Sequence, residues 1–230
     1  MDGAAYIERR DKIRTYFDRT AVDAWKRLAT EAPLGRIRAT VREGRGRMRA
    51  AMLAMLPQDL SGWRVLDAGC GAGMFSLELA RRGAEVTAID LSPEMVDFAA
   101  KTMPADLGAG RIKFMSGDML SDKLGRFDAV VAMDSLIHYP LADAAEAIDR
   151  LAARTQRSIV FTFAPRTPAL AAMHALGRLF PRGDRAPAIE PVRPEAITAR
   201  LDGVSGWQTG RTTRVSHGFY TSQAMELVRS

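Results

Sequence analysis

Between residues 63 and 163 the chain alternates short apolar runs with amphipathic stretches of helical period. The apolar runs have the length of buried strands, and the stretches between them place their hydrophobic residues three or four positions apart. Strands and helices that alternate at this spacing predict an α/β fold with a doubly wound parallel sheet. We expect strands at 64–67, 85–90, 111–116, 127–133 and 158–163, and helices at 74–82, from 93 onward and at about 141–154.

The segment before the first strand is polar but keeps a helical pattern. Residues 4–31 place an apolar face on one or two helices, formed by Ile13, Phe17, Ala21, Ala24 and Leu28. A second helix is expected over 36–56, where Gly44 and Gly46 each weaken the middle by about 1 kcal/mol. Its inward residues are expected to be Ile37, Val41, Met48, Met52 and Met55.

The chain after residue 163 has a different character. Prolines and glycines crowd residues 181–194, which is typical of a long surface connection that contributes to a binding site. Further on, the runs 206–215 and 217–222 have the composition of strands and can form a hairpin.

The charge is concentrated at one end of the chain. The formal net charge is +6, and residues 1–50 carry 13 Lys and Arg against 7 Asp and Glu, whereas the remainder is balanced at 20 against 20. A basic segment suits nucleic acid, an anionic membrane face or an acidic small substrate, and it is also common on a solvated helical face. The chain shows no membrane-spanning run, no signal segment and a single cysteine, so we expect a cytoplasmic protein.

A glycine-rich loop carries the strongest chemical signal. In the run from Val65 to Gly73, Asp67 ends a strand, glycines occupy 69, 71 and 73, and a helix follows. Such a loop lets a ligand approach the backbone closely, but a pyrophosphate fingerprint would place its third glycine at 74. An acid before the loop suits a positively charged ligand, which points to S-adenosylmethionine. Cys70 fits this loop as a small filler between two glycines.

Two more acids end neighbouring strands. Asp90 can accept hydrogen bonds from both ribose hydroxyls, and Asp118 can accept one from the adenine amine. The carboxyl ends of parallel strands meet at the edge of a sheet where α/β folds bind ligands. We therefore expect one cofactor site that consists of Asp67, Gly69, Cys70, Gly71, Gly73, Asp90, Leu91, Asp118, Met119 and Met133.

These motifs carry a family resemblance. Residues 63–163 resemble class I S-adenosylmethionine-dependent methyltransferases, which implies a Rossmann-like, mostly parallel sheet of seven strands. Four further runs resemble the magnesium-protoporphyrin IX O-methyltransferases of chlorophyll and bacteriochlorophyll synthesis, namely Tyr16–Arg27, Leu136–Tyr139, Phe180–Pro187 and Gly218–Ser222. The resemblance implies transfer of a methyl group to one propionate of magnesium-protoporphyrin IX, with magnesium present only as part of the substrate.

The charge and the expected elements also predict how the chain is organised. Residues 1–56 are expected to form an N-terminal helical lid that contacts the substrate, and 57–230 the methyltransferase domain, with 164–200 as an insertion on the substrate side. The resemblance implies two further contacts, one with the subunit of magnesium chelatase that binds the porphyrin and one, peripheral, with a photosynthetic membrane. Nucleic acid is not an expected partner, because the basic segment shows no RNA-binding motif.

The acceptor site is assigned more loosely than the cofactor site. A propionate is already ionised at neutral pH, so no strong general base is required. His138, Tyr139 and Tyr16 are the candidate catalytic residues, and Arg38, Arg42, Phe17 and Trp25 the candidate substrate-binding residues. His174 and His217 are conceivable axial ligands of the substrate magnesium, although packing roles are more common. Another flat acceptor, such as a quinol or a phenol, stays open as an alternative, and so does a nucleic-acid methyltransferase.

Overall fold

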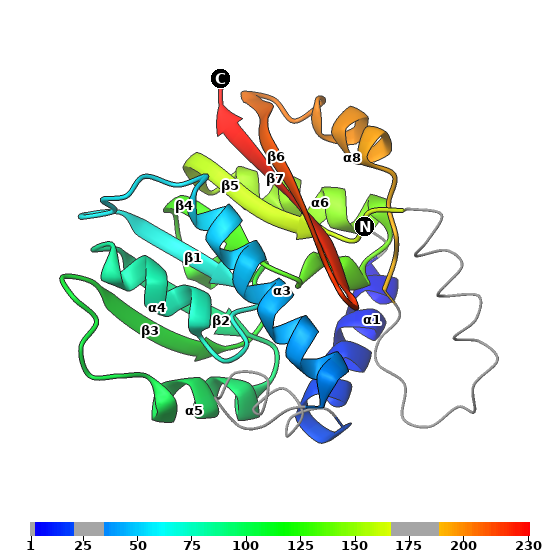
Figure 1. Cartoon of the computed structure of the whole chain (residues 1–230). Helices are drawn as coiled ribbons and strands as arrows, with labels where there is room; N and C mark the ends of the chain where they lie inside the picture. Colours follow the sequence, from blue (N-terminus) through cyan, green and yellow to red (C-terminus); the bar gives the residue numbers. More distant parts are fainter. Residues whose placement is uncertain (1–2, 21–34, 167–188) are drawn as a thin grey trace.

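A sheet of seven strands forms the centre of the molecule (Figure 1). The structure is a computed structural model that describes residues 3–20, 35–166 and 189–230. The sheet has the order β3-β2-β1-β4-β5-β7-β6, in which β7 runs antiparallel to both of its neighbours and the other pairs are parallel. The strands are β1 (Arg64–Ala68), β2 (Glu85–Asp90), β3 (Arg111–Ser116), β4 (Phe127–Ala132), β5 (Thr155–Phe163), β6 (Trp207–His217) and β7 (Tyr220–Arg229). The predicted doubly wound, mostly parallel fold is confirmed.

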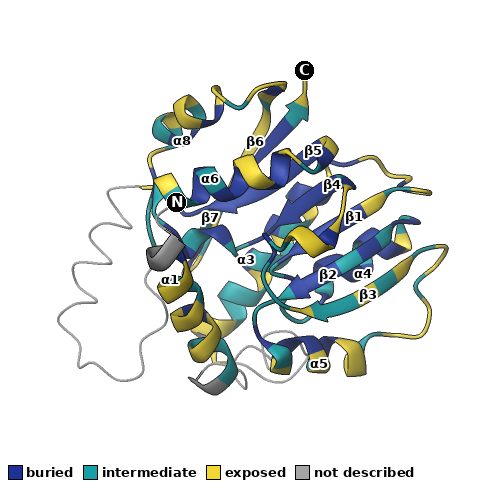
Figure 2. Ribbon diagram, turned by 180° about the vertical axis from the view of Figure 1, so that it is seen from behind, coloured by how far each residue is buried: buried dark blue, intermediate teal, exposed yellow. Residues whose placement is uncertain are grey.

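Helices cover both faces of the sheet. The helices α3 (Arg36–Leu53) and α4 (Met74–Arg81) pack on one face, α6 (Leu141–Ala152) and α8 (Pro194–Leu201) pack on the other, and α5 (Pro93–Thr102) packs against β2 and β3. Successive residues of β4 alternate between the two cores: Val130 lies in one and Val131 in the other. Because both faces are covered, the central strands are buried along most of their length (Figure 2).

The N-terminal segment lies across the carboxyl ends of the strands. Helix α1 (Gly3–Thr15) continues into a π-helical turn, η1 (Tyr16–Thr20). Ile13, on the predicted apolar face, is buried, and Phe17 packs against the same core. The rest of that predicted face, Ala21, Ala24 and Leu28, lies outside the described residues.

Helix α3 begins at Arg36, as predicted, but differs from its prediction in its last residue and in the burial of its first turns. It ends at Leu53 rather than at residue 56, and Ile37 is 57% exposed, so the prediction that Ile37 faces inward was wrong. Burial along α3 begins at Gly44, because the earlier turns project beyond the core, and Met48 and Met52 are fully buried. The second half of the predicted lid segment 1–56 thus packs into the core of the sheet.

The C-terminal hairpin is confirmed, but its last strand is longer than predicted. The strand β7 continues to Arg229, although polar residues interrupt its apolar pattern. Gln223 and Glu226 are buried because arginines of β6 bind them: Arg214 donates to Gln223, and Arg211 forms an ion pair with Glu226 at 2.8 Å. Helix α8 begins inside the predicted insertion 164–200 but ends one residue beyond it, and residues 167–188 of this insertion are outside the described part.

Two short turns complete the described elements. A 3-10 turn, η2 (Asp122–Leu124), precedes β4, and another, η3 (Leu136–His138), follows it.

Among the helices of the described residues, none is both long and apolar enough to span a membrane.

Candidate active site

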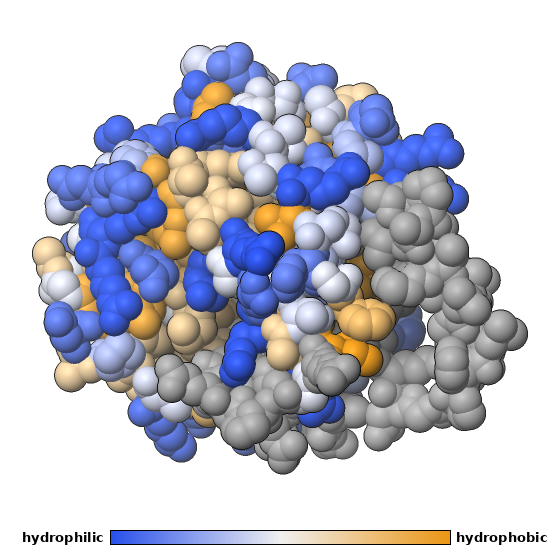
Figure 3. Space-filling view, viewed as in Figure 1, coloured by the Kyte–Doolittle hydropathy of each residue, from blue (hydrophilic) through white to orange (hydrophobic). Residues whose placement is uncertain are grey.

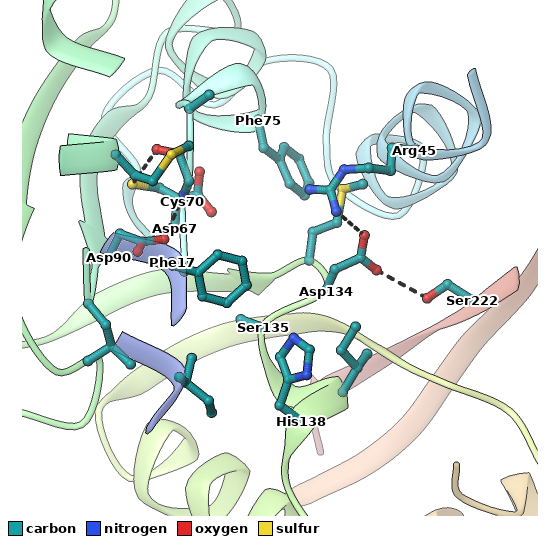
Figure 4. Close-up of a pocket in the computed structure, with 18 of the residues that line it drawn as sticks. Phe17, Arg45, Asp67, Cys70, Phe75, Asp90, Asp134, Ser135, His138 and Ser222 are labelled. Atoms are coloured by element: carbon teal, nitrogen blue, oxygen red, sulfur yellow. Dashed lines mark hydrogen bonds and ion pairs between the residues drawn. The ribbon is translucent and has the colours of Figure 1, made fainter. Parts of the chain in front are cut away.

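A cavity of about 880 Å³ opens at the carboxyl ends of β1, β2 and β4. Its walls come from α1 and η1, from α3, from the glycine loop, from the segments that follow β2, β3 and β4, and from the tip of the β6–β7 hairpin. In Figure 4, Asp67, Cys70 and Asp90 lie on one side of this cavity, Arg45 and Asp134 lie on the other, and Phe17 lies between them.

Asp67 is the most deeply buried acid of the site. It lies near the carboxyl end of β1 and is almost fully buried. The Ser76 hydroxyl of α4 donates a hydrogen bond of 2.6 Å to its carboxyl group. Burial raises the pKa of Asp67 to about 7, and the nearby carboxyl group of Asp90 contributes to the rise. A cation that enters the cavity would stabilise the ionised form.

The glycine loop keeps the backbone open to a ligand. Gly69 has a φ of +84°, and a Cβ at this position would lie 2.5 Å from the Cβ of Ser135. Gly71 has a φ of +52°, lines the cavity, and would direct a Cβ into space that holds no atom within 4 Å. Gly73 does not line the cavity, and the side chains of Met103 and Phe114 would contact a Cβ at this position.

Cys70 lines the cavity, and burial raises the pKa of its thiol. This agrees with its role as a small filler rather than a nucleophile.

Asp90 closes the next part of the wall. One carboxylate oxygen accepts the Gly71 N–H at 2.8 Å, and the other accepts the Ser92 N–H at 3.0 Å. These bonds connect the ends of β1 and β2, and burial raises the pKa of Asp90. Leu91 lines the cavity beside it. Asp90 keeps further lone pairs with which it can accept ribose hydroxyls.

Asp118 is bound by the N-terminal helix. The Tyr6 hydroxyl donates to one carboxylate oxygen at 3.0 Å, and Arg10 donates to the other at 3.4 Å. The ring of Tyr6 stacks on Tyr139 with 5.6 Å between centroids. Sequence reasoning did not identify Tyr6 or Arg10, because only the fold brings α1 beside the segment after β3. Met119 and Met133 are buried and line the same cavity.

The three candidate catalytic residues all line the cavity. His138 is buried in η3, and its ring lies 6.1 Å from that of Phe17, centroid to centroid. Tyr139 is also buried, and burial raises its pKa to about 12. Tyr16 is partly buried against Phe17, and burial raises its pKa. Neither tyrosine is suited to act as a base near neutral pH.

Asp134 is a site residue that sequence reasoning missed. It follows β4 and adopts a φ of +56°, which is uncommon for a residue other than glycine. Arg45 of α3 donates to its carboxylate at 2.7 Å, and the hydroxyls of Tyr220 and Ser222 donate to it from β7 at 3.1 and 3.3 Å. Figure 4 shows Arg45, Asp134 and Ser222 together on one side of the cavity, opposite Asp67 and Asp90. An acid at the end of a fourth strand was the only available signal.

Among the predicted substrate-binding residues, Phe17 and Arg42 line the cavity, Arg38 is exposed outside the lining, and Trp25 is not among the described residues. Two more arginines of α3, Arg45 and Arg49, line the cavity together with Arg42. These three arginines share the side of the helix that faces the cavity. On the face of the molecule seen in Figure 3, hydrophilic side chains lie beside apolar ones.

No group of three or more potential metal ligands occurs among the residues that the structure describes. His217 is hydrogen-bonded to Glu43 at 2.9 Å and does not line the cavity, and His174 lies outside the described residues.

The residues of the cavity fit S-adenosylmethionine. Gly71 leaves a cradle in the backbone, Asp67 is a buried acid that a cation would stabilise, and Asp90 and Asp118 keep oxygens available at adjacent strand ends. This arrangement on a sheet of order 3-2-1-4-5-7-6 defines the class of S-adenosylmethionine-dependent methyltransferases with a Rossmann-like fold.

Comparisons with known proteins narrow this class. A family model described as magnesium-protoporphyrin IX methyltransferase C-terminus matches residues 132–229, and a methyltransferase-domain model matches 65–157. The magnesium-protoporphyrin O-methyltransferase of Rhodobacter capsulatus is 47% identical, with 96% of this chain and 97% of the relative covered. The corresponding protein of Synechocystis is 34% identical over 98% of this chain and 99% of its own length. A crystal structure of the Synechocystis enzyme with bound SAH superimposes with a TM-score of 0.81 at 33% identity, over 95% of this chain and 98% of that one. The chain belongs to the magnesium-protoporphyrin O-methyltransferase family.

Proposed function

We propose that this protein transfers a methyl group from S-adenosylmethionine to a propionate of magnesium-protoporphyrin IX and forms the monomethyl ester. The observation that carries the proposal is the separation of charge in the cavity. Three acids, Asp67, Asp90 and Asp118, lie at the strand ends. Three arginines of α3 line the cavity as well, namely Arg42, Arg45 and Arg49. A cationic donor and an anionic acceptor need such a pair of walls.

The acidic wall would hold the cofactor. Gly69 and Gly71 give access to the backbone, Asp90 would accept the ribose hydroxyls, and Asp118 would accept the adenine amine. Leu91, Met119 and Met133 would enclose the adenosine. When bound, the cofactor supplies an electrophilic methyl group that a propionate oxygen takes in line, as the carbon–sulfur bond breaks and S-adenosylhomocysteine forms.

The protein contributes alignment rather than proton transfer to this reaction. The carboxylate is ionised at neutral pH, so its attack releases no proton. His138 and Tyr139 project from the segment after β4, where they would orient the propionate, while Phe17 and Tyr16 would cover the macrocycle. Correct alignment of the reacting atoms can itself supply much of the rate enhancement.

Methyl transfer itself provides the first test. The protein is incubated with magnesium-protoporphyrin IX and with S-adenosylmethionine that carries a deuterated methyl group. The porphyrin products are then separated, and their molecular masses are measured by mass spectrometry. We expect one labelled methyl ester per porphyrin and none with the variant Gly71→Val, whose side chain would occupy the cradle. Transfer to a quinol or a phenol in preference to the porphyrin would contradict the proposal.

Delivery of the substrate belongs to the same proposal. Ile189 and Phe219 are exposed and line the cavity, so they would form an apolar rim through which a flat macrocycle enters. Such a rim would suit contact with the porphyrin-binding subunit of magnesium chelatase or with the surface of a photosynthetic membrane.

A further inference from the structure

The element that carries His138 is a single turn of the chain. The 3-10 turn η3 has three residues, and the Tyr139 N–H closes it by donating to the Leu136 carbonyl at 3.1 Å. Ser135 stands at its N-terminus without a side-chain cap. Because 3-10 hydrogen bonds have poor geometry, a turn of this length depends on neighbouring segments for its position.

Two segments that are distant in the sequence bind the carbonyl groups of this turn. The Glu190 N–H donates to the Ile137 carbonyl at 2.8 Å. Nη1 of Arg9 donates to the His138 carbonyl at 3.2 Å. Glu190 belongs to the segment 189–192, which hydrogen-bonds to the chain just after β5. The position of η3 therefore depends on α1 and on this segment.

Arg9 and Glu190 also bind each other. The same Arg9 nitrogen lies 3.2 Å from Oε1 of Glu190, so one guanidinium group connects α1, η3 and the segment 189–192. The two side chains are 34% and 38% exposed, and ion pairs in such surroundings add little to the stability of a protein. This contact therefore matters more for the geometry around His138 than for folding.

The N-terminal segment also contacts the ring of the same histidine. Phe17 of η1 lies beside the His138 imidazole, with 6.1 Å between the ring centroids, and both residues line the cavity (Figure 4). Thus α1 binds the backbone of His138, and η1 packs against its side chain. Because α1 continues directly into η1, a displacement of α1 would alter both contacts.

Resting on the function proposed above, we infer that Arg9, paired with Glu190, is a positioning residue that fixes η3 and so directs the His138 ring at the acceptor carboxylate. Arg9 does not line the cavity, so it would act through His138 rather than on the acceptor. Small displacements of an aligning group lower the rate of a reaction that depends on alignment. Loss of the Arg9 contact should therefore lower kcat more than it weakens the binding of either ligand.

The test uses the full-length protein and four variants. Arg9→Met removes the guanidinium and keeps an unbranched side chain, and Arg9→Lys keeps the charge but not the fork of donors. Glu190→Gln removes the ion pair and leaves the backbone bond to Ile137. Lys12→Met is the matched control, because it breaks an exposed pair with Glu8 on the same helix. Thermal unfolding establishes that each variant is folded.

Steady-state kinetics in two backgrounds shows whether Arg9 acts through His138. We expect Arg9→Met to lower kcat about 3- to 10-fold, while KM for magnesium-protoporphyrin IX and the Kd of S-adenosylmethionine stay within about twofold. In the background of His138→Ala, Arg9→Met should lower kcat no further, because the group that it positions is absent. Equal losses in both backgrounds would overturn the inference.

The other variants refine this result. Arg9→Lys should recover part of the loss in kcat, because its ammonium group can still donate to the His138 carbonyl. Glu190→Gln should cause a smaller loss than Arg9→Met, since the bond from Arg9 to that carbonyl remains. Lys12→Met should behave as the unaltered protein. A loss in Lys12→Met as large as that in Arg9→Met would overturn the inference.

A second measurement does not depend on methyl transfer. The chain has three histidines, so the ring signals of His138 can be assigned by NMR with 15N-labelled histidine, by comparison with His138→Ala. We expect Arg9→Met to shift or broaden the His138 signals and to leave those of His217 unchanged. Unaltered His138 signals in folded Arg9→Met would overturn the inference, whether or not the protein methylates the porphyrin. Altered signals in a protein without methyl transfer would support the positioning role and reject the proposed function.

Discussion

Asp67 affects both the unfolding free energy of the protein and its affinity for a cation. Its carboxyl group has a pKa of about 7 in the folded protein, against about 3.9 in an unfolded chain. Between these values the folded state holds the proton more tightly, so the unfolding free energy falls as the pH rises from about 4 to about 7. At neutral pH and above, the ionised, buried carboxylate is therefore a cost that a bound cation would offset.

Replacing Asp67 by asparagine should separate the two effects. The variant Asp67→Asn removes the charge and keeps an oxygen that accepts from Ser76. We expect a higher unfolding temperature of the ligand-free protein at pH 8, and binding of S-adenosylmethionine weakened about 10- to 100-fold. In the unaltered protein, affinity should increase from pH 5.5 to 7, since Asp67 must lose its proton to pair with the cofactor. Calorimetry over this range checks the expectation, and equal pH slopes in both proteins would contradict it.

At this scale the sequence predicted the residues that line one side of the cavity better than those that line the other. The predicted cofactor residues, apart from Gly73, line one cavity, because each lies at a strand end or in the loop beside it. Asp134, Arg45 and Arg49 were not identified, since their proximity depends on how α3 and β7 pack against β4. No local pattern encodes a contact between residues 45 and 134.

One glycine of α3, Gly44, is required by the packing of this helix on β7, although its low helix propensity predicts only a weaker helix. Gly44 and Gly46 were both predicted to weaken the helix. A Cβ on Gly44 would lie 2.7 Å from the Cβ of Tyr220, whereas one on Gly46 would have no atom within 4 Å. Gly44 thus permits the close approach that brings α3 to the tyrosine bonded to Asp134. Helical period predicts that a helix exists but cannot show which of its glycines faces a neighbour.

The two glycines should respond oppositely to alanine. Gly44→Ala is expected to displace Tyr220, to lower the free energy of unfolding by about 1–3 kcal/mol, and to impair methyl transfer. Gly46→Ala should raise the free energy of unfolding by about 1 kcal/mol, because alanine favours the helix and no atom obstructs it. Urea denaturation of both variants measures the difference. Similar changes in the two would show that the α3–β7 contact does not depend on Gly44.

Across the whole molecule, α1 joins segments that are distant in the sequence. It contacts the acid after β3 through Tyr6 and Arg10, and Arg9 donates to the His138 carbonyl and pairs with Glu190. The predicted lid over the acceptor site therefore also covers the side of the cavity predicted to hold adenine. Sequence periodicity predicted the helix, but its position depends on polar contacts between segments more than a hundred residues apart. The division at residue 56 stays a prediction.

Loosening α1 should therefore alter cofactor exchange. In the double variant Tyr6→Phe with Arg10→Ala, Asp118 loses two of its three donors and keeps the Leu120 N–H at 2.8 Å. A carboxylate accepts about four hydrogen bonds, so Asp118 can bind α1 and an adenine amine together, and losing α1 removes a wall rather than a competitor. We expect the Kd of S-adenosylmethionine to rise about 3- to 10-fold, mainly through faster dissociation measured by stopped-flow fluorescence. The control variant Lys12→Ala breaks an exposed ion pair with Glu8 and should change neither the Kd nor the dissociation rate. Tighter binding in the double variant would mean that Tyr6 and Arg10 compete with the cofactor for Asp118.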